Sequence, residues 1–256
     1  MTTLSQIIMK AVQTKIKLAD LQTYADLNKL ANSSVSIFPA EIKNDDEKKQ
    51  AYTQYSEKLL QEYYDLNKDG KTTVEEFAQK EQNASEKALK LQKQGLASGA
   101  IKNLEADKDM LKFYDTTGDG KISIDEYNDG LKKLGLSDMV ESTELSDQEK
   151  RIAHNSANLF AKNLDMDGDG KISTKELTFF NEQADQCDGK ADGIITNAGE
   201  SVMFSAVTGM NANDKEINRV VNKYLLGETL TTEEQATLDR GTSTIRNSMK
   251  KAAGWE

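Results

Sequence analysis

We predict an all-α fold for this chain of 256 residues, on two observations. The composition favours helices, because Lys, Glu, Leu and Ala are frequent and Pro39 is the single proline. Apolar and aromatic residues recur at steps of three and four residues on either side of several Asp/Gly-rich segments, which is the period of one helix face. The sequence therefore predicts helix–loop–helix units, with additional helices at the N- and C-terminal ends.

Charge and hydropathy limit the classes of function. The net charge is −10 and the pI about 4.9, so the surface repels phosphate backbones and nucleic acid is not expected as a general partner. No stretch approaches the roughly 18 apolar residues of a membrane span, and the first residues lack the apolar run of a signal peptide. We therefore expect a cytoplasmic protein, with export by a route without a cleaved signal left open. The single cysteine, Cys187, excludes an intramolecular disulfide.

An Asp/Gly-rich segment recurs along the chain. Copies open at Asp65, Asp115 and Asp165, at a spacing of 50 residues, and a weaker copy opens at Asp188, 23 residues after the third. A helical pattern precedes each of the first three copies. Before the third, residues 146–149 read Ser-Asp-Gln-Glu, a capping box that predicts a helix start. We expect breaks between units at residues 93–100, where two glycines lie, and at residues 135–146.

Two of the copies carry oxygen ligands at every position that a calcium loop needs. Ca²⁺ takes six to eight oxygens at roughly 2.3–2.6 Å, and a twelve-residue loop can supply them from positions 1, 3, 5, 7, 9 and 12, with glycine turning at position 6. At position 7 the backbone carbonyl is the ligand. In loop 1 (residues 65–76) these candidates are Asp65, Asn67, Asp69, Lys71, Thr73 and Glu76. In loop 3 (residues 165–176) they are Asp165, Asp167, Asp169, Lys171, Ser173 and Glu176.

The other two copies depart from this pattern to different degrees. In loop 2 (residues 115–126) the candidates are Asp115, Thr117, Asp119, Lys121, Ser123 and Glu126, and the uncharged threonine predicts weaker binding. The fourth copy has Lys190 at position 3, and its glutamate falls one residue late. Its candidates are Asp188, Asp192 and Glu200, and a unit that only pairs with its neighbour is the favoured interpretation.

Loops 1 and 3 match the pattern D-x-[DN]-x-[DN]-G-x5-E in full, and the chain thereby resembles the EF-hand family of calcium-binding proteins. The order of its units is similar to that of calmodulin and of sarcoplasmic calcium-binding proteins. The resemblance implies Ca²⁺ as the ligand, with Mg²⁺ as a competitor. It also implies that hands pair through position 8, so that Thr72 of loop 1 would meet Ile122 of loop 2, and Ile172 of loop 3 would meet Ile195 of the fourth copy.

These interpretations divide the chain into four parts. An N-terminal amphipathic helix and linker would occupy residues 1–45, a first hand pair residues 46–140, a second pair with a degenerate fourth hand residues 141–212, and C-terminal helices residues 213–256. Loop 3 has four carboxylates at positions 1, 3, 5 and 12, against three in each of loops 1 and 2. We therefore expect loop 3 to bind the ion most tightly.

Two functions remain open at the level of sequence, a calcium sensor and a calcium buffer or calcium-stabilised structural protein. A sensor would expose an apolar groove for a partner helix. The candidate N-terminal helix, residues 3–31, is basic in an acidic chain, so it could occupy such a groove of its own protein, and a membrane surface is the weaker alternative. Catalysis is not expected, because His154 is the only histidine and no nucleophile motif accompanies Cys187.

Overall fold

The prediction of an all-α fold is confirmed. The computed structural model describes residues 22–23, 25, 35–36, 45–136, 142–186, 194–195, 214–252 and 254, and most of them are helical. In this part of the chain the strands are two residues long: β1 (Val35–Ser36) pairs antiparallel with β2 (Ile194–Ile195). No described helix is both long and apolar enough to cross a membrane. The helix predicted over residues 3–31 lies almost wholly outside the described residues.

Three helix–loop–helix units occupy the predicted places, and we call them hands 1, 2 and 3. Hand 1 consists of α3 (Asp45–Leu59), the π-helical turn η2 (Leu60–Tyr64), loop 1 and α4 (Val74–Glu105). Hand 2 consists of α5 (Lys108–Tyr114), loop 2 and α6 (Ile124–Lys133). Hand 3 consists of α7 (Asp147–Leu164), loop 3 and α8 (Thr174–Gln186). Two further helices follow, α10 (Lys215–Leu226) and α11 (Thr232–Ala252), in the C-terminal part where the sequence predicted helices.

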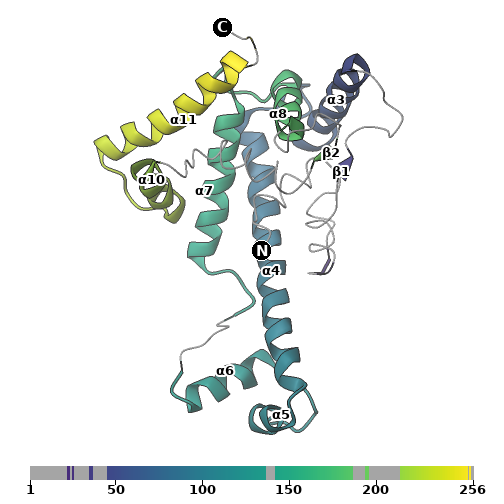
Figure 1. Cartoon of the computed structure of the whole chain (residues 1–256), viewed down its shortest axis with the longest axis vertical. Helices are drawn as coiled ribbons and strands as arrows, with labels where there is room; N and C mark the ends of the chain where they lie inside the picture. The colour runs from purple at the N-terminus through teal and green to yellow at the C-terminus, as the bar shows by residue number, and fades with distance from the viewer. Residues whose placement is uncertain are drawn as a thin grey trace.

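Helix α4 is longer than the sequence suggested. The break expected over residues 93–100 is wrong, because α4 runs without interruption for 32 residues through Gly95 and Gly99. Ala97 and Ile101 are buried on either side of Gly99. Their packing outweighs the roughly 1 kcal/mol that each glycine costs inside a helix relative to alanine. Helix α7 lies along the first part of α4, while α5 and α6 lie at its far end (Figure 1).

The buried side chains form separate clusters. The largest joins hands 1 and 3 and contains Tyr64, Phe77, Phe160 and Phe180 among others, with the rings of Tyr64 and Phe77 stacked at 4.2 Å between centroids. A second cluster belongs to hand 2 and the end of α4. A third holds α10 and α11 against Leu159 of α7. Hands 1 and 3 therefore share a core, and hand 2 has its own.

Loop 1 pairs with loop 3, so the expected pairing of loop 1 with loop 2 is wrong. The Ile172 N–H donates to the carbonyl of Thr72 at 2.7 Å, and the Val74 N–H donates to the carbonyl of Gly170 at 3.1 Å. Thr73 and Lys171 form the bridge between them. The reason is the length of α4, which at 1.5 Å per residue places loops 1 and 2 at opposite ends of a rod of roughly 48 Å.

The expected pairing of loop 3 with the fourth copy is also wrong, because loop 3 is already paired with loop 1. The backbone of Ile172 is already bonded to loop 1. Ile195, the residue predicted to meet it, pairs instead with Val35, and Ile194 pairs with Ser36. The fourth copy thus contributes a strand to residues that precede the first hand in sequence.

The start of α7 follows the predicted capping box. The Glu149 N–H donates to Ser146 Oγ at 3.2 Å, and the Ser146 N–H donates back to Glu149 Oε2 at 2.7 Å. Lys93 of α4 reaches the same carboxylate at 2.9 Å and ties the cap to the long helix. The cap therefore supports both α7 and its packing on α4.

We expect Ser146→Ala to lower the free energy of unfolding by about 1 kcal/mol, because the alanine leaves the first-turn N–H of Glu149 without its acceptor. Urea unfolding of the metal-free protein measures this. Ser243→Ala, inside α11, is the matched control and should leave stability equal or slightly higher, since alanine favours a helix interior. Equal loss in both variants would contradict a capping role.

The last two helices are joined by a charged cluster. Glu234 of α11 accepts from Lys223 at 2.7 Å and from Arg219 at 2.8 Å, both on α10. The Lys223 ammonium, then the Thr231 N–H and Arg219, lower the pKa of Glu234 to about 2 from its ordinary 4.5. Gly227, with φ of 74°, ends α10 in the left-handed conformation that glycine adopts readily.

Candidate metal centre

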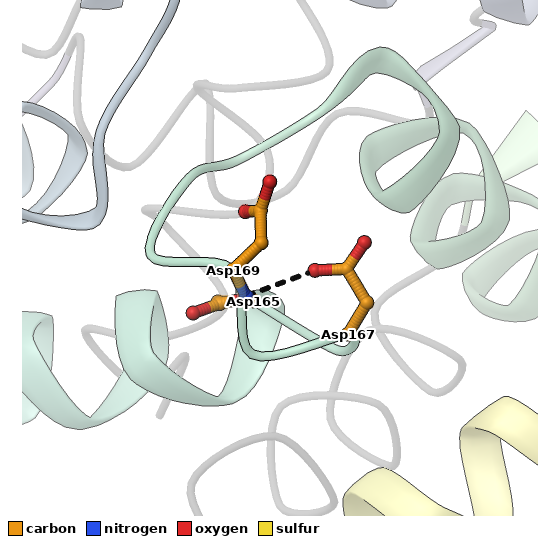
Figure 2. A group of neighbouring side chains, drawn as sticks. All are labelled: Asp165, Asp167 and Asp169. Carbon is orange, nitrogen blue, oxygen red and sulfur yellow. Dashed lines mark hydrogen bonds between the residues drawn. The ribbon is translucent and has the colours of Figure 1, made fainter.

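Loop 3 brings three carboxylates together. It leaves α7 after Leu164 and enters α8 at Thr174, and Asp165, Asp167 and Asp169 each offer an oxygen within 4.8 Å of the others. Figure 2 shows the three side chains around the turn, with Asp169 donating its N–H to Asp167 Oδ1 at 3.1 Å. Asp165 is buried, whereas the other two are exposed. A group of carboxylate oxygens this close together suits a hard divalent cation, which prefers oxygen ligands.

Glu176 closes loop 3 from its far end. Its Oε1 accepts the N–H of Met166 at 2.7 Å, and its Oε2 accepts the N–H of Ser173 at 2.8 Å. A carboxylate from position 12 is thus folded back over positions 2 and 3, where it also accepts the Asp167 N–H at 3.3 Å. Burial raises the pKa of Glu176 from its ordinary value, and hydrogen bonds led by that from Ser173 oppose the rise. Loop 3 therefore holds its fourth carboxylate in the most enclosed setting of the three loops.

The backbone of loop 3 turns where the pattern requires glycine. Gly170, at position 6, has φ of 81°, a left-handed conformation that glycine adopts without strain from a Cβ. The turn directs the Gly170 N–H to Asp165 Oδ2 at 3.1 Å and the Gly168 N–H to Asp165 Oδ1 at 2.8 Å. These bonds fix the position-1 carboxylate at the mouth of the loop.

Loop 1 repeats this arrangement with less burial. The Gly70 N–H donates to Asp65 Oδ2 at 2.9 Å, and Glu76 accepts the N–H groups of Asn67 at 3.2 Å and Thr73 at 2.9 Å. The Thr73 N–H is the main cause of a lowered pKa of Glu76, against a rise from desolvation. Position 4 is Lys68 with φ of 61°, where loops 2 and 3 have glycine. A side chain at this left-handed position costs about 1 kcal/mol.

Loop 2 has the same backbone and one carboxylate fewer than loop 3. The Gly120 N–H donates to Asp115 Oδ2 at 2.8 Å, and Thr117 Oγ1 donates to Asp115 Oδ1 at 3.3 Å. Glu126 accepts the N–H groups of Ser123 at 3.0 Å and Thr117 at 3.0 Å. These two backbone donors, Ser123 first, lower the pKa of Glu126 to about 2 from 4.5. The position-12 carboxylate is therefore ionised at neutral pH and ready to meet a cation.

One predicted ligand position also serves the fold, and another stays out of the pairing between loops. The position-9 hydroxyls of Thr73, Ser123 and Ser173 are the N-caps of α4, α6 and α8, and each accepts the N–H of the position-12 glutamate. The position-7 carbonyls of Lys71 and Lys171 stay out of the two bonds that join loops 1 and 3, which use Thr72 and Gly170 instead. The pairing of loops 1 and 3 therefore does not use the two carbonyl oxygens that are predicted to bind the ion.

Other predicted residues fall elsewhere. Asp188, Asp192 and Glu200 of the fourth copy lie outside the described residues. His154 is hydrogen-bonded through Nε2 to Glu86 and so joins α7 to α4, which is a packing contact. Ligand roles for individual residues of the three described loops stay predictions.

Sequence analysis missed one buried acid beside hand 1. Glu81 of α4 is 2% exposed and accepts a hydrogen bond from the Tyr64 hydroxyl, which precedes loop 1. The signal was present, because Glu81 lies four residues after Phe77 on the apolar face of α4. A charged residue on such a face indicates a buried carboxyl with a specific partner.

Comparison with known proteins matches two of the three described loops to one family. The family model described as EF hand matches residues 108–132 and 162–180, which contain loops 2 and 3. Loop 1 lies outside both matched ranges. Comparisons with curated proteins and with solved structures found no match.

Proposed function

We propose that this chain, which belongs to the EF-hand family of calcium-binding proteins, binds Ca²⁺ in loops 1, 2 and 3 and acts as a calcium sensor. The observation that carries the proposal is the geometry of loop 3, where Asp165, Asp167 and Asp169 each offer an oxygen within 4.8 Å of the others and Glu176 folds back over the loop. Four carboxylates on one loop suit a hard cation that prefers oxygen ligands. Mg²⁺ would compete at the same oxygens.

Hands 1 and 3 would act as one unit. Their loops are joined by two backbone hydrogen bonds and their helices share the largest core cluster. An ion in one loop would order the backbone that the other loop uses, because the bonded residues follow directly on the ligand positions. This favours a shared response to calcium rather than two separate ones.

The sensor alternative is supported by apolar surface on hand 2. Met110, Phe113, Leu134 and Leu136 are 42–54% exposed, on α5 and at the end of α6. Ion binding that reorients α5 and α6 would change this surface and its affinity for a partner helix. The buffer or structural alternative applies if the surface does not respond.

We propose no catalytic activity, and the docking of the basic segment 3–31 onto the hands stays a proposal about residues outside the described ones.

Calorimetric titration of the metal-free chain with calcium, in a magnesium background, tests the proposal. We expect three binding events, and each of Glu76→Gln, Glu126→Gln and Glu176→Gln should weaken most strongly the event at its own loop. A dye that reports exposed apolar surface should brighten with calcium in a sensor and stay constant in a buffer. The proposal of calcium binding is wrong if metal-free and calcium-saturated protein have the same spectra, heat stability and bound-ion content.

A further inference from the structure

We infer that the C-terminal end of α4 takes the place of a partner hand for hand 2, with Glu105 as the positioning residue for loop 2. The inference rests on the proposed calcium binding by that loop. It starts from a difference between the loops: loops 1 and 3 satisfy each other's backbone, whereas the described contacts of loop 2 include no second loop.

The backbone N–H at position 8 needs an acceptor. In loop 3 this donor is Ile172, and the acceptor is the Thr72 carbonyl of loop 1 at 2.7 Å. The equivalent donor in loop 2 is Ile122, which is only 3% exposed, so water is a poor substitute. In the structure the Ile122 N–H donates to Glu105 Oε1 at 2.9 Å. A side-chain carboxylate therefore occupies the place that a partner backbone carbonyl has in the other pair.

The apolar contact of a partner hand is replaced as well. Ile122 belongs to a cluster of buried residues with Tyr114, Tyr127 and Leu131 of hand 2. Ile101 of α4 completes this cluster, and Leu104 packs against it. The last turns of α4 thus supply both the apolar cover and the hydrogen-bond acceptor that a second hand would bring.

The energetics of helix α4 alone do not favour a glutamate at position 105. It is the last residue of α4, where the negative end of the helix dipole disfavours an acidic side chain. The bond to Ile122 offsets that repulsion, and a hydrogen bond to a charged acceptor contributes more than one between neutral groups.

Glu105 acts on the ion through Ile122. The N–H that it holds directly follows the Lys121 carbonyl, the predicted position-7 ligand, on the same peptide unit. Lys121 in turn donates its N–H to Asp119 Oδ1 at 2.9 Å, so one rigid stretch carries two predicted ligands. Loss of the Glu105 bond would let this stretch move and would misplace both oxygens.

The experiment uses the full chain and amide NMR, with Glu105→Ala, Glu105→Gln and Asp109→Asn. The glutamine keeps an oxygen acceptor without the charge, and Asp109→Asn removes a comparable exposed charge from α5 of the same hand. In metal-free protein the Ile122 amide should exchange with solvent about tenfold faster in Glu105→Ala and at the native rate in Glu105→Gln and Asp109→Asn. In a calcium titration the Gly120 amide reports loop 2, while Gly70 and Gly170 are internal controls for loops 1 and 3.

We expect Glu105→Ala to raise the calcium midpoint of Gly120 about tenfold without moving those of Gly70 and Gly170. Glu105→Gln should restore the native midpoint to within about twofold, as should Asp109→Asn. Equal effects of the alanine and the glutamine would overturn the inference, because charge alone would then explain them. Shifts at all three glycines, or an unchanged Ile122 exchange rate in Glu105→Ala, would also overturn it. If the Gly120 amide signal of the native protein does not change with calcium, the proposed function fails at loop 2. The exchange rates of the Ile122 amide in metal-free protein still decide the role of Glu105.

Discussion

Glu176→Gln will weaken calcium binding at loop 3 by on the order of a hundredfold, or roughly 2.7 kcal/mol. The substitution removes one of four carboxylates and the two-oxygen grip that position 12 supplies to the ion. It acts in the most enclosed of the three described loops, where Glu176 is 1% exposed, so water cannot easily replace the lost oxygen. Calorimetric titration of the variant measures the loss.

The paired loops make this prediction more specific. Because Ile172 and Thr72 are hydrogen-bonded, the same substitution should also weaken loop 1, by a smaller factor, and should leave loop 2 unchanged. Glu75→Gln is the control, since it removes an exposed carboxylate from the first turn of α4 without touching a predicted ligand. The ranking of the sites is wrong if the highest-affinity binding event survives in Glu176→Gln. The pairing has no effect on binding if the calcium affinity of loop 1 is unchanged in that variant.

Glu81 will make the stability of the metal-free protein fall as the pH rises from about 4.5 to about 7. Burial raises the pKa of Glu81 to about 7 from 4.5, against a smaller lowering by the Tyr64 hydroxyl. Its Oε2 has no hydrogen-bond partner among the described residues. Between pH 4.5 and about 7 the folded protein therefore keeps the Glu81 carboxyl protonated, whereas the unfolded chain has released this proton. The stabilisation is complete below pH 4.5 and is lost as the pH passes through the folded value.

The size of this effect is roughly 3 kcal/mol, the free energy that corresponds to the difference between the two pKa values. Glu81→Gln should remove this part of the pH dependence and raise the stability at pH 8 relative to the native chain. Urea unfolding at several pH values between 5 and 8 measures both, and Glu57→Gln, an exposed site on α3, is the control. Parallel pH profiles for the native chain and Glu81→Gln would show that Glu81 is not the group responsible.

Local signals in the sequence predicted local structure well. The capping box at Ser146 depends on residues within one turn of each other and is found in place, and the three aspartates of loop 3, spaced two residues apart, offer oxygens within 4.8 Å of one another. The extent of α4 was missed because Gly95 and Gly99 break a helix only when nothing packs across them. Here Ala97 is 1% exposed, and tertiary contacts decide the outcome.

Contacts between segments distant in the chain could not be predicted from the sequence. Thr72, Ile122 and Ile172 all suit a short strand pair, so position 8 alone cannot tell which loops meet. The answer depends on the uninterrupted length of α4, which separates loops 1 and 2, and on the aromatic cluster that joins hands 1 and 3. Glu105 was missed for the same reason, because its partner Ile122 lies 17 residues away and only the bend between α4 and α5 brings them together.

The 32-residue rod of α4 has a consequence for how the chain would read a changing calcium concentration. At one end, two joined loops would fill together and give a steep, threshold-like occupancy curve. At the other end, a solitary loop would fill gradually over a wider range. Because loop 3 is expected to bind most tightly and loop 2 more weakly, a small rise in calcium would register at the paired end and a larger one at both, on opposite tips of a single stiff helix.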